Sequence, residues 1–207
     1  MTKMLKNIIA GAAVLAAACL FGQVQPVQAA DDYALRLAED NQWYYYQDDE
    51  VDTAYQGLAL NEYGWWYVSD GTIDWDYTGM VCNEYGWWYY QNGNLNREYT
   101  GMAHNEYGWW YFSNGYLDMN YTGMAVNEYS WWYFNNGYLD MNYTGMAVNE
   151  YGWWYFNNGY LDMNYTGIAS NEYGSWYYRN GIIAYDYSGT VADNGKTYTV
   201  QNGFVIA

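Results

Sequence analysis

Pairs of adjacent tryptophans recur every 22 residues and are the residues of this chain best suited to contact a ligand. Around Trp153 and Trp154 the sequence is NEYGWWYF, and similar eight-residue segments begin at Asn61, Asn83, Asn105, Asn127 and Asn171. An indole face can stack on the apolar face of a sugar ring or attract a quaternary ammonium group, at roughly 0.5–2 kcal/mol per contact. Because single contacts are weak, a repeated array favours a repeating ligand.

Three positions of each repeat are candidate ligand-binding positions. The first tryptophans are Trp65, Trp87, Trp109, Trp131 and Trp153. The second tryptophans are Trp66, Trp88, Trp110, Trp132, Trp154 and Trp176. The following tyrosines are Tyr67, Tyr89, Tyr111, Tyr133, Tyr155 and Tyr177. We predict that second tryptophans build the core, while first tryptophans meet a ligand to which the tyrosines offer hydroxyls. Alternatively, second tryptophans also line a ligand cage, or first tryptophans are structural and pack against the next hairpin.

Catalysis has little support in these repeats. His104, the single histidine, and Cys82 occupy the same variable position, held by Val148 in a later repeat, and drift at a tolerant position explains both. A carboxylate pair such as Glu150 and Asp162 recurs in nearly every repeat, and one chain has no use for five or six copies of an active site. We therefore expect no enzyme and no cofactor.

Recurring acidic residues leave one metal alternative open. Asp118, Asp140 and Asp162 each stand two residues before an asparagine, and oxygen ligands at regular spacing suit calcium. The chain has neither an EF-hand loop nor the glycine-rich nonapeptide of calcium β-rolls, and Asn96 and Ala184 interrupt the series. Solvated residues at the rim are the simpler interpretation, so we expect no metal.

Six repeats without gaps position the aromatic residues, at 61–82, 83–104, 105–126, 127–148, 149–170 and 171–192. A degenerate repeat lies in the segment 31–60, and a truncated one occupies 193–207; atypical end repeats suit the caps of a stack. Leucine-rich repeats have a similar period, but their L-x-x-L-x-L spacing is absent. Two glycines and many Tyr, Trp and Thr in each repeat favour strands over helices.

A hairpin accounts for the first half of each repeat. Asn149 and Gly152 fit the first and fourth places of a type I turn, although Ser130 shows that glycine is not obligatory. This turn pairs Val148 with Trp153, Ala147 with Trp154, Met146 with Tyr155 and Gly145 with Phe156. Side chains alternate faces, so second tryptophans share a close-packed face with Phe156, and first tryptophans lie on a more open face.

A second turn follows at Asn157-Asn158-Gly159, with glycine suited to a left-handed conformation. The segment 160–166 is then a short strand or extended connector. In it, Leu161 faces the core, and Asp162 and Asn164 lie on the rim. One paired change supports the hairpin register: where the first tryptophan becomes Ser175, its predicted partner is Ser170.

The start of the chain predicts export. Lys3 and Lys6 precede an apolar run from Ile8 to Phe21, and small residues before position 30 suit cleavage, so residues 1–29 are interpreted as a secretory signal peptide. The apolar run is too short for a confident membrane span, and no later run could cross a membrane. Cys19 leaves a lipoprotein as the alternative.

Net charge limits the class of ligand that the chain can bind, and the cysteine count limits its disulfides. The formal net charge of −17 becomes −19 once the two leader lysines are removed. Such a chain repels nucleic acid, and it suits a cationic or neutral ligand. Acidity equally serves to keep an aromatic-rich surface in solution. Cys82 is then the single cysteine, so no intramolecular disulfide can form and packing must supply the stability.

The order Thr144-Gly145, Gly152, Trp154-Tyr155-Phe156 and Gly159 resembles the cell-wall-binding repeats of Gram-positive bacteria, which are the choline-binding and glucan-binding modules. The resemblance covers residues 39–207. It implies an all-β fold, a β-solenoid of stacked β-hairpin repeats, with aromatic ligand cages between successive repeats. It also implies attachment to a cell-wall polymer, teichoic acid or polysaccharide, or to a choline-like ligand.

The chain departs from that family at one position. The family usually has Thr-Gly-Trp, whereas this chain has Met80, Met102, Met124, Met146, Ile168 and Thr190 after the Thr-Gly or Ser-Gly pair. One wall of the choline cage is therefore missing or replaced, and the first tryptophan of each pair is additional. We expect a secreted, non-catalytic binding module at the cell surface. The alternative is a self-associating surface or adhesion protein that uses the same aromatic array against a protein partner.

Overall fold

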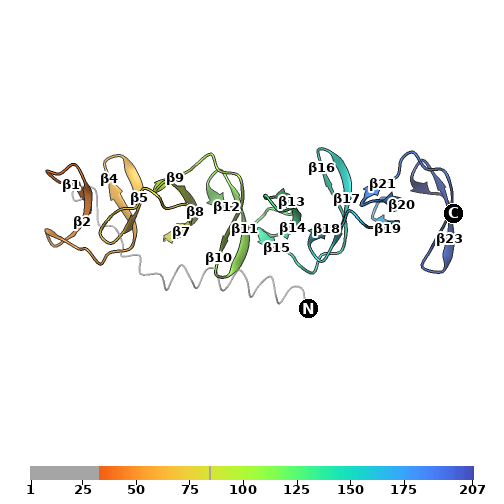
Figure 1. Cartoon of the computed structure of the whole chain (residues 1–207), viewed down its shortest axis with the longest axis horizontal. Coiled ribbons are helices and arrows are strands. Elements are labelled where there is room, and N and C mark those ends of the chain that lie inside the picture. Colours follow the sequence, from red (N-terminus) through yellow and green to blue (C-terminus); the bar gives the residue numbers. More distant parts are fainter. Residues whose placement is uncertain (1–32, 84) are drawn as a thin grey trace. The chain divides into compact units, whose positions relative to one another are not determined.

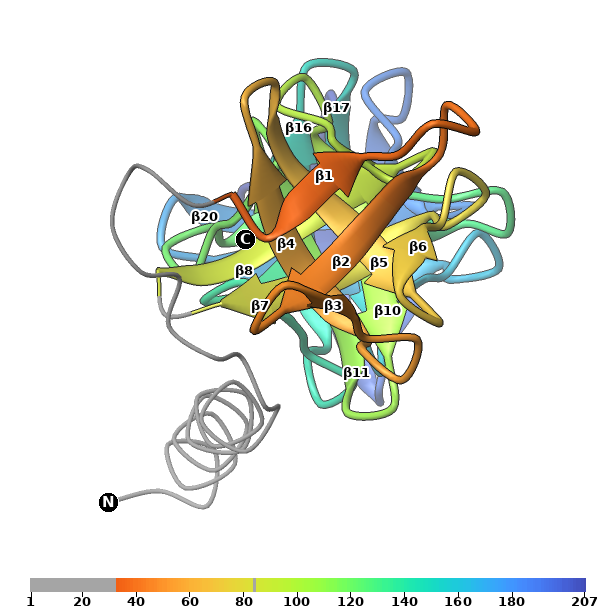
Figure 2. The same ribbon diagram turned by 90° about the vertical axis from the view of Figure 1, so that its left-hand side faces the viewer.

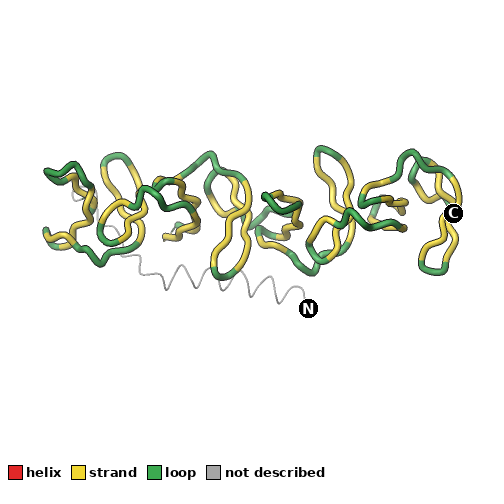
Figure 3. Tube along the Cα trace, viewed as in Figure 1, coloured by secondary structure: helices red, strands yellow, loops and turns green. Residues whose placement is uncertain are grey.

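The computed structural model describes residues 33–83 and 85–207, so the predicted signal peptide at 1–29 and the lipoprotein alternative at Cys19 lie outside it. The described residues form strands and turns and no helix (Figures 1 and 3). They divide into two units, one ending at Met119 and one beginning at Asn120. Within each unit the fold is the predicted all-β, solenoid-like stack of hairpin repeats, which confirms the expected fold class.

The first unit contains β1 (Leu35–Leu37), β2 (Trp43–Gln47), β3 (Glu50–Val51), β4 (Gly57–Asn61), β5 (Gly64–Ser69), β6 (Thr72–Ile73), β7 (Gly79–Asn83), β8 (Gly86–Gln91), β9 (Asn94–Leu95), β10 (Gly101–Asn105), β11 (Gly108–Ser113) and β12 (Tyr116–Leu117). The second unit contains β13 (Gly123–Val126), β14 (Trp131–Asn135), β15 (Tyr138–Leu139), β16 (Gly145–Asn149), β17 (Gly152–Asn157), β18 (Tyr160–Leu161), β19 (Gly167–Asn171), β20 (Gly174–Arg179), β21 (Ile182–Ile183), β22 (Gly189–Asp193), β23 (Lys196–Gln201) and β24 (Phe204–Val205).

Each repeat consists of a long hairpin and a short return strand. β16 and β17 are antiparallel, and Val148 lies opposite Trp153 while Gly145 lies opposite Phe156. The predicted register is therefore confirmed, and the same pairing recurs in the other hairpins. β18 then runs back along β17. The strand after the second turn is shorter than the predicted segment 160–166, because the chain turns again at Asp162.

The second turn joins one repeat to the repeat before it. Asn158 and Gly159 have φ of 52° and 76°, as a two-residue type I′ turn requires. The Gly159 amide donates to the carbonyl of Tyr143 at 2.8 Å, and the Gly159 carbonyl accepts from the amide of Tyr133 at 2.9 Å. A Cβ at Gly159 would lie 2.5 Å from the carbonyl oxygen of Asp140. Glycine is needed here for its left-handed conformation and for this close approach.

The first turn tolerates a change of residue. In the hairpin of β16 and β17, Asn149 pairs with Gly152, and Gly152 has φ of 132°. Ser130 takes that place between β13 and β14, without a positive φ. There the strand starts later, and the Ser130 amide donates to Asn127 Oδ1 at 3.1 Å. The expectation that glycine is not obligatory in this turn is confirmed.

The core lies between consecutive hairpins of a unit. Phe156 is fully buried and packs with Ala147 of its own hairpin and Met124 of the preceding one. In the first unit, Leu35 of β1 packs against Ala59 in the same way. Figure 2 shows β1 and β2 lying across β4 and β5. Each hairpin therefore covers the hairpin that follows it.

Stacking partly covers the hairpin face that carries the first tryptophans. Met146 is only 7% exposed, and Trp153 packs with it against Ala169 and Tyr178 of the next hairpin. Val148 on the same face is 51% exposed, so this face is half covered, and the first tryptophans on it are half-buried. Strand alternation assigns a side chain to a face but does not show that a neighbouring repeat covers both faces.

We predict that Gly159→Ala lowers the stability of the protein by at least about 2 kcal/mol, because the new Cβ adds a backbone clash to the strain of a left-handed residue. The matched control is Gly152→Ser, which introduces the residue found at Ser130 and should cost less than about 1 kcal/mol. Thermal unfolding followed by circular dichroism measures both. Equal effects of the two exchanges would contradict the role given to Gly159.

Candidate functional site

The second tryptophans are anchored to the first turn of their own hairpin. Trp154 Nε1 donates to Asn149 Oδ1 at 2.9 Å, and the same oxygen accepts the Tyr151 amide at 2.9 Å. Four other repeats have the indole bond, from Trp66, Trp88, Trp110 and Trp132. In these five repeats the indole N–H is therefore occupied by the asparagine.

Aromatic edges from neighbouring positions also cover these rings. Trp132 meets Tyr160 of the next repeat at a centroid distance of 5.2 Å, and Trp176 meets Phe204 at 4.8 Å, both edge to face. At Trp66 the corresponding residue of the next repeat is Asn94, and Trp75 supplies the aromatic edge instead, at 5.2 Å. The second tryptophans thus have structural contacts on the ring and on its nitrogen.

The following tyrosines are held in stacked pairs. Tyr155 lies parallel to Tyr165 at 3.4 Å, and the Tyr165 hydroxyl donates to the carbonyl of Ile168 at 2.8 Å. The same stack forms at Tyr45–Tyr55, Tyr67–Tyr77, Tyr89–Tyr99 and Tyr133–Tyr143. Burial, together with the neighbouring tyrosine of each pair, raises the pKa of Tyr99 and of Tyr143 to about 12. These tyrosines therefore pack the repeat.

The first tryptophans have one side on the core and one edge at the surface. Trp153 meets Tyr173 of the next hairpin edge to face at 6.4 Å, and Trp43 meets Tyr63 in the same way at 6.0 Å. Tyr173 is 69% exposed, and Val148, the strand partner of Trp153, is 51% exposed. The Glu172 carboxylate accepts a hydrogen bond from the Tyr173 phenol, which raises the pKa of that phenol. An aromatic corner with a carboxylate beside it results; we call it the Trp153–Tyr173 corner.

The variable position, held by Val148 in one repeat, lies opposite the first residue of the tryptophan pair, as the predicted register requires. Ser170 and Ser175 share a hydrogen bond between their hydroxyls at 2.7 Å, so the predicted pairing of the two serines is confirmed. His104 stacks on Trp109 at 4.7 Å. Cys82 is buried opposite Trp87.

The acidic and amide residues of the third segment shape the return turn. Asp162 Oδ1 accepts the Asn164 amide at 2.9 Å, and Asn164 is exposed on the rim as predicted. Asp140 holds Asn142 in the same way but is itself buried. Among residues 33–83 and 85–207, no group of three or more His, Cys, Asp or Glu side chains is placed to hold a metal ion. Nor does this part of the chain contain a helix able to span a membrane.

Two structural positions were not singled out by the sequence analysis. Asn149 was interpreted as a turn residue only, although its side chain also fixes Trp154. Tyr165 was given no particular contact, although it stacks on Tyr155. The signal was present in the sequence, because an asparagine and a tyrosine recur at these two positions in all six repeats.

These contacts define an all-β hairpin-repeat protein whose aromatic residues lie between successive repeats. The choline-binding repeat profile matches six segments, 54–74, 76–96, 98–118, 120–140, 142–162 and 164–184. The chain belongs to the choline-binding repeat family, which confirms the resemblance. Each matched segment contains one hairpin with its return strand, as 142–162 contains β16, β17 and β18.

Two solved structures are similar to parts of the chain. One is described as the crystal structure of CbpF in complex with ipratropium by soaking; the identity is 21%, the TM-score is 0.28, and the match covers 85% of this chain and 60% of that one. The other is ASR alternansucrase in complex with isomaltotriose, with 17% identity, a TM-score of 0.33, and coverage of 77% and 13%. The chain thus spans less than two thirds of either protein. The comparison with curated proteins gives no match.

We predict that Asn149→Ala lowers stability by about 1–3 kcal/mol, because the exchange leaves the Trp154 indole and the Tyr151 amide without their acceptor. Asn149→Asp is the control, since a carboxylate oxygen accepts both bonds and Asp193 occupies the corresponding place in the last hairpin. Thermal unfolding should separate the two variants. A loss as large with aspartate as with alanine would show that the acceptor is not what matters.

We also predict that stability falls in alkali. Burial raises the pKa of Tyr99 and Tyr143 to about 12, above the value of about 10 for an unfolded tyrosine. Because the folded pKa is the higher one, this stabilisation is complete below about pH 10 and is lost as the pH rises towards 12. Ultraviolet titration of tyrosine ionisation, together with urea unfolding at pH 8 and pH 11, measures it. Ionisation of all tyrosines near pH 10 in the folded protein would contradict the prediction.

Proposed function

We propose that this protein is a secreted, non-catalytic binding module that attaches to a Gram-positive cell-wall polymer through choline-like groups or sugar rings. The observation that carries this proposal is the run of six choline-binding repeats over residues 54–184. The first tryptophan of each pair is only half-buried, which supports contact with a ligand at the surface. Repetition supports a polymeric ligand, because several weak contacts then act together.

The chemistry of the Trp153–Tyr173 corner supports a cationic group. A quaternary ammonium placed over the face of the exposed Tyr173 ring, beside Trp153, gains cation–π attraction. The Glu172 carboxylate adds an opposite charge, and the formal net charge of −17 draws cations towards the protein. A sugar ring stacked on the same surface would gain the aromatic contact but not the charge.

Methionine in place of the family tryptophan supports contact at the outer edge of the repeat. Met146 is buried in a cluster with Ala169, and Trp153 and Trp176 from two successive repeats pack against that cluster. The methionine side chain therefore fills space between the aromatic walls. We assign ligand contact to the first tryptophans, and we assign the second tryptophans and the stacked tyrosines to the support of the fold.

A self-associating surface protein is the second candidate, and the tips of the hairpins favour it. Tyr63, Tyr129 and Tyr151 are 75%, 75% and 73% exposed, each next to a glutamate. Exposed aromatic residues are a common contact surface between proteins. Concentration-dependent association in the absence of glycan would favour this candidate.

We predict that the purified protein is retained on isolated Gram-positive cell walls and that replacing Trp109, Trp131 and Trp153 with serine reduces retention at least tenfold. Serine already stands at this position as Ser175. Sedimentation with the walls, in the presence and absence of free choline, measures retention. Release by choline identifies the cationic group as the ligand. Retention that choline leaves unchanged, but free sugar releases, identifies stacked sugar rings.

Controls separate binding from folding. The first tryptophans contact the core, so the triple variant must be shown to unfold cooperatively above the assay temperature. Replacing Asn142 and Asn164 with aspartate, the residue found at Asp76 and Asp186, is a matched change on the rim that should leave retention within twofold. Undiminished retention by a folded triple variant would remove the first tryptophans from the site, and no retention by the unmodified protein would refute the proposed function.

A further inference from the structure

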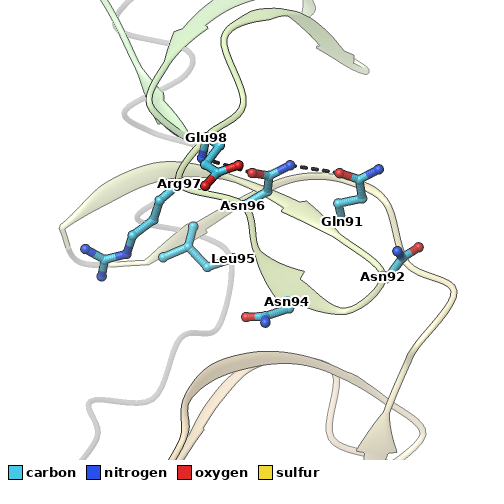
Figure 4. A pocket seen from close by; sticks show the side chains of 7 residues that line it. All are labelled: Gln91, Asn92, Asn94, Leu95, Asn96, Arg97 and Glu98. Atoms are coloured by element: carbon cyan, nitrogen blue, oxygen red, sulfur yellow. Dashed lines mark hydrogen bonds between the residues drawn. The ribbon is translucent and has the colours of Figure 1, made fainter.

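The described part of the first unit contains an open hollow of about 390 Å³ that differs in chemistry from the aromatic array. Its lining consists of Gln91, Asn92, Asn94, Leu95, Asn96, Arg97 and Glu98, in and after the return strand β9 (Figure 4). The volume lies in the range of small-molecule sites. All but one of the lining side chains are polar, so the hollow suits a ligand rich in oxygen atoms.

Comparison with the other repeats shows that the polar residues are particular to this one. Where this repeat has Asn94, others have Thr72, Tyr116, Tyr138, Tyr160 and Ile182. Where it has Asn96, others have Asp74, Asp118, Asp140, Asp162 and Ala184. Where it has Arg97, others have Trp75, Met119, Met141, Met163 and Tyr185. Three exchanges in four residues thus replace mostly apolar and acidic side chains with two amides and a guanidinium.

The exchange at Asn96 removes a negative charge without changing the turn. Asn96 Oδ1 accepts the Glu98 amide at 2.9 Å, just as Asp74 Oδ1 accepts the Asp76 amide at 3.0 Å. The new amide nitrogen of Asn96 donates to Gln91 Oε1 at 2.8 Å (Figure 4). This bond orients the Gln91 amide and leaves its nitrogen as a donor. A carboxylate at position 96 would instead repel an anion.

Arg97 supplies a positive charge that no neighbour neutralises within the described residues. Arg36 pairs with Asp49 at 2.7 Å, and Arg179 pairs with Asp186 at 2.6 Å. No such pair forms at Arg97 between residues whose positions are described, and its side chain and that of Glu98 extend in different directions (Figure 4). A guanidinium recognises carboxylate and phosphate through two parallel hydrogen bonds.

The lining of the hollow is linked to an exposed tryptophan through Trp66. Asn94 is the backbone partner of Trp66, and the Trp66 ring contacts Trp75, which is 50% exposed. A sugar or polyol carrying an anionic group could therefore place its carbon face towards Trp75 and its hydroxyls towards the amides. Bare phosphate would use Arg97 and the amides only.

We infer that this hollow binds an anionic oxygen group, a phosphate or a carboxylate, carried on a sugar or polyol. Arg97 holds the anion, Gln91 and Asn94 donate to oxygen atoms, and Asn96 supplies the acceptor oxygen of the turn without adding a second carboxylate beside Glu98. The site is distinct from the first tryptophans and does not rest on the proposed function. It gives an otherwise acidic protein one place where the anionic part of a polymer is tolerated.

The test is a titration of the full protein followed by nuclear magnetic resonance of the side-chain amides of Gln91 and Asn94 and of the Arg97 Nε–H group. The probes are glucose 6-phosphate, glucuronate, inorganic phosphate and glucose. We expect saturable shifts with the sugar anions and none with glucose at the same concentrations. The tighter of glucose 6-phosphate and glucuronate identifies phosphate or carboxylate as the preferred group.

Three substitutions each introduce a residue that other repeats have at the same position, so each variant should fold. Arg97→Met should weaken binding of both sugar anions at least tenfold, and Asn96→Asp should weaken it severalfold. Trp75→Met should weaken glucose 6-phosphate binding while leaving inorganic phosphate unchanged. Unfolding temperatures close to that of the unmodified protein confirm that each variant is folded.

Three results would overturn the inference: absence of saturable shifts, affinity for sugar anions unchanged by Arg97→Met, or equal binding of glucose. The Arg97→Met variant also separates the two proposals. If it loses the sugar anions but keeps choline-sensitive retention on cell walls, the hollow and the aromatic array are independent sites.

Discussion

Backbone hydrogen bonds at the Asn-Gly turn set the spacing between consecutive hairpins, and the other contacts depend on that spacing. Gly159 donates to Tyr143 and accepts from Tyr133, and Gly93 makes the same two bonds to Tyr77 and Tyr67 in the first unit. At this separation the ring of Phe156 fills the space above Ala147, and Met124 of the preceding hairpin closes it. A two-stranded hairpin cannot bury its faces alone, so its stability comes from its neighbours.

Within that spacing, each aromatic position of the repeat makes a different structural contact. The indole N–H of the second tryptophan donates to the turn asparagine, and its ring contacts an aromatic residue of the next repeat. The following tyrosine stacks on its partner, and the partner hydroxyl ties the return turn to the next hairpin strand. These contacts satisfy the polar atoms of large rings at the place where they are buried. The first tryptophan remains half-buried beside the exposed tyrosine of the next hairpin, and this is the part of the array that we propose for ligand contact.

Much of the fold could be predicted because local chemistry and periodicity agree. The Asn-Gly pair specifies a type I′ turn, and the pairing of Val148 with Trp153 follows from the first turn and strand alternation. The burial of Trp153 could not be predicted in the same way, because it depends on Ala169 and Tyr178 of another repeat. The stack of Tyr155 on Tyr165 also joins residues on either side of a turn, and spacing alone did not show that they meet.

A repeat array also makes variation informative, because each position is sampled several times in one protein. Positions that must fit a neighbour, such as Gly159 and Trp154, keep their residue in nearly every copy. At Asn96 the turn requires only an acceptor oxygen, which Asp and Asn both provide, so the charge there can change without cost to the backbone. At Arg97 the side chain projects from an exposed turn, and Met, Trp and Tyr occupy the same place elsewhere. Freedom at these two positions explains how one repeat can acquire a polar hollow while its hairpin keeps the register and contacts of the others.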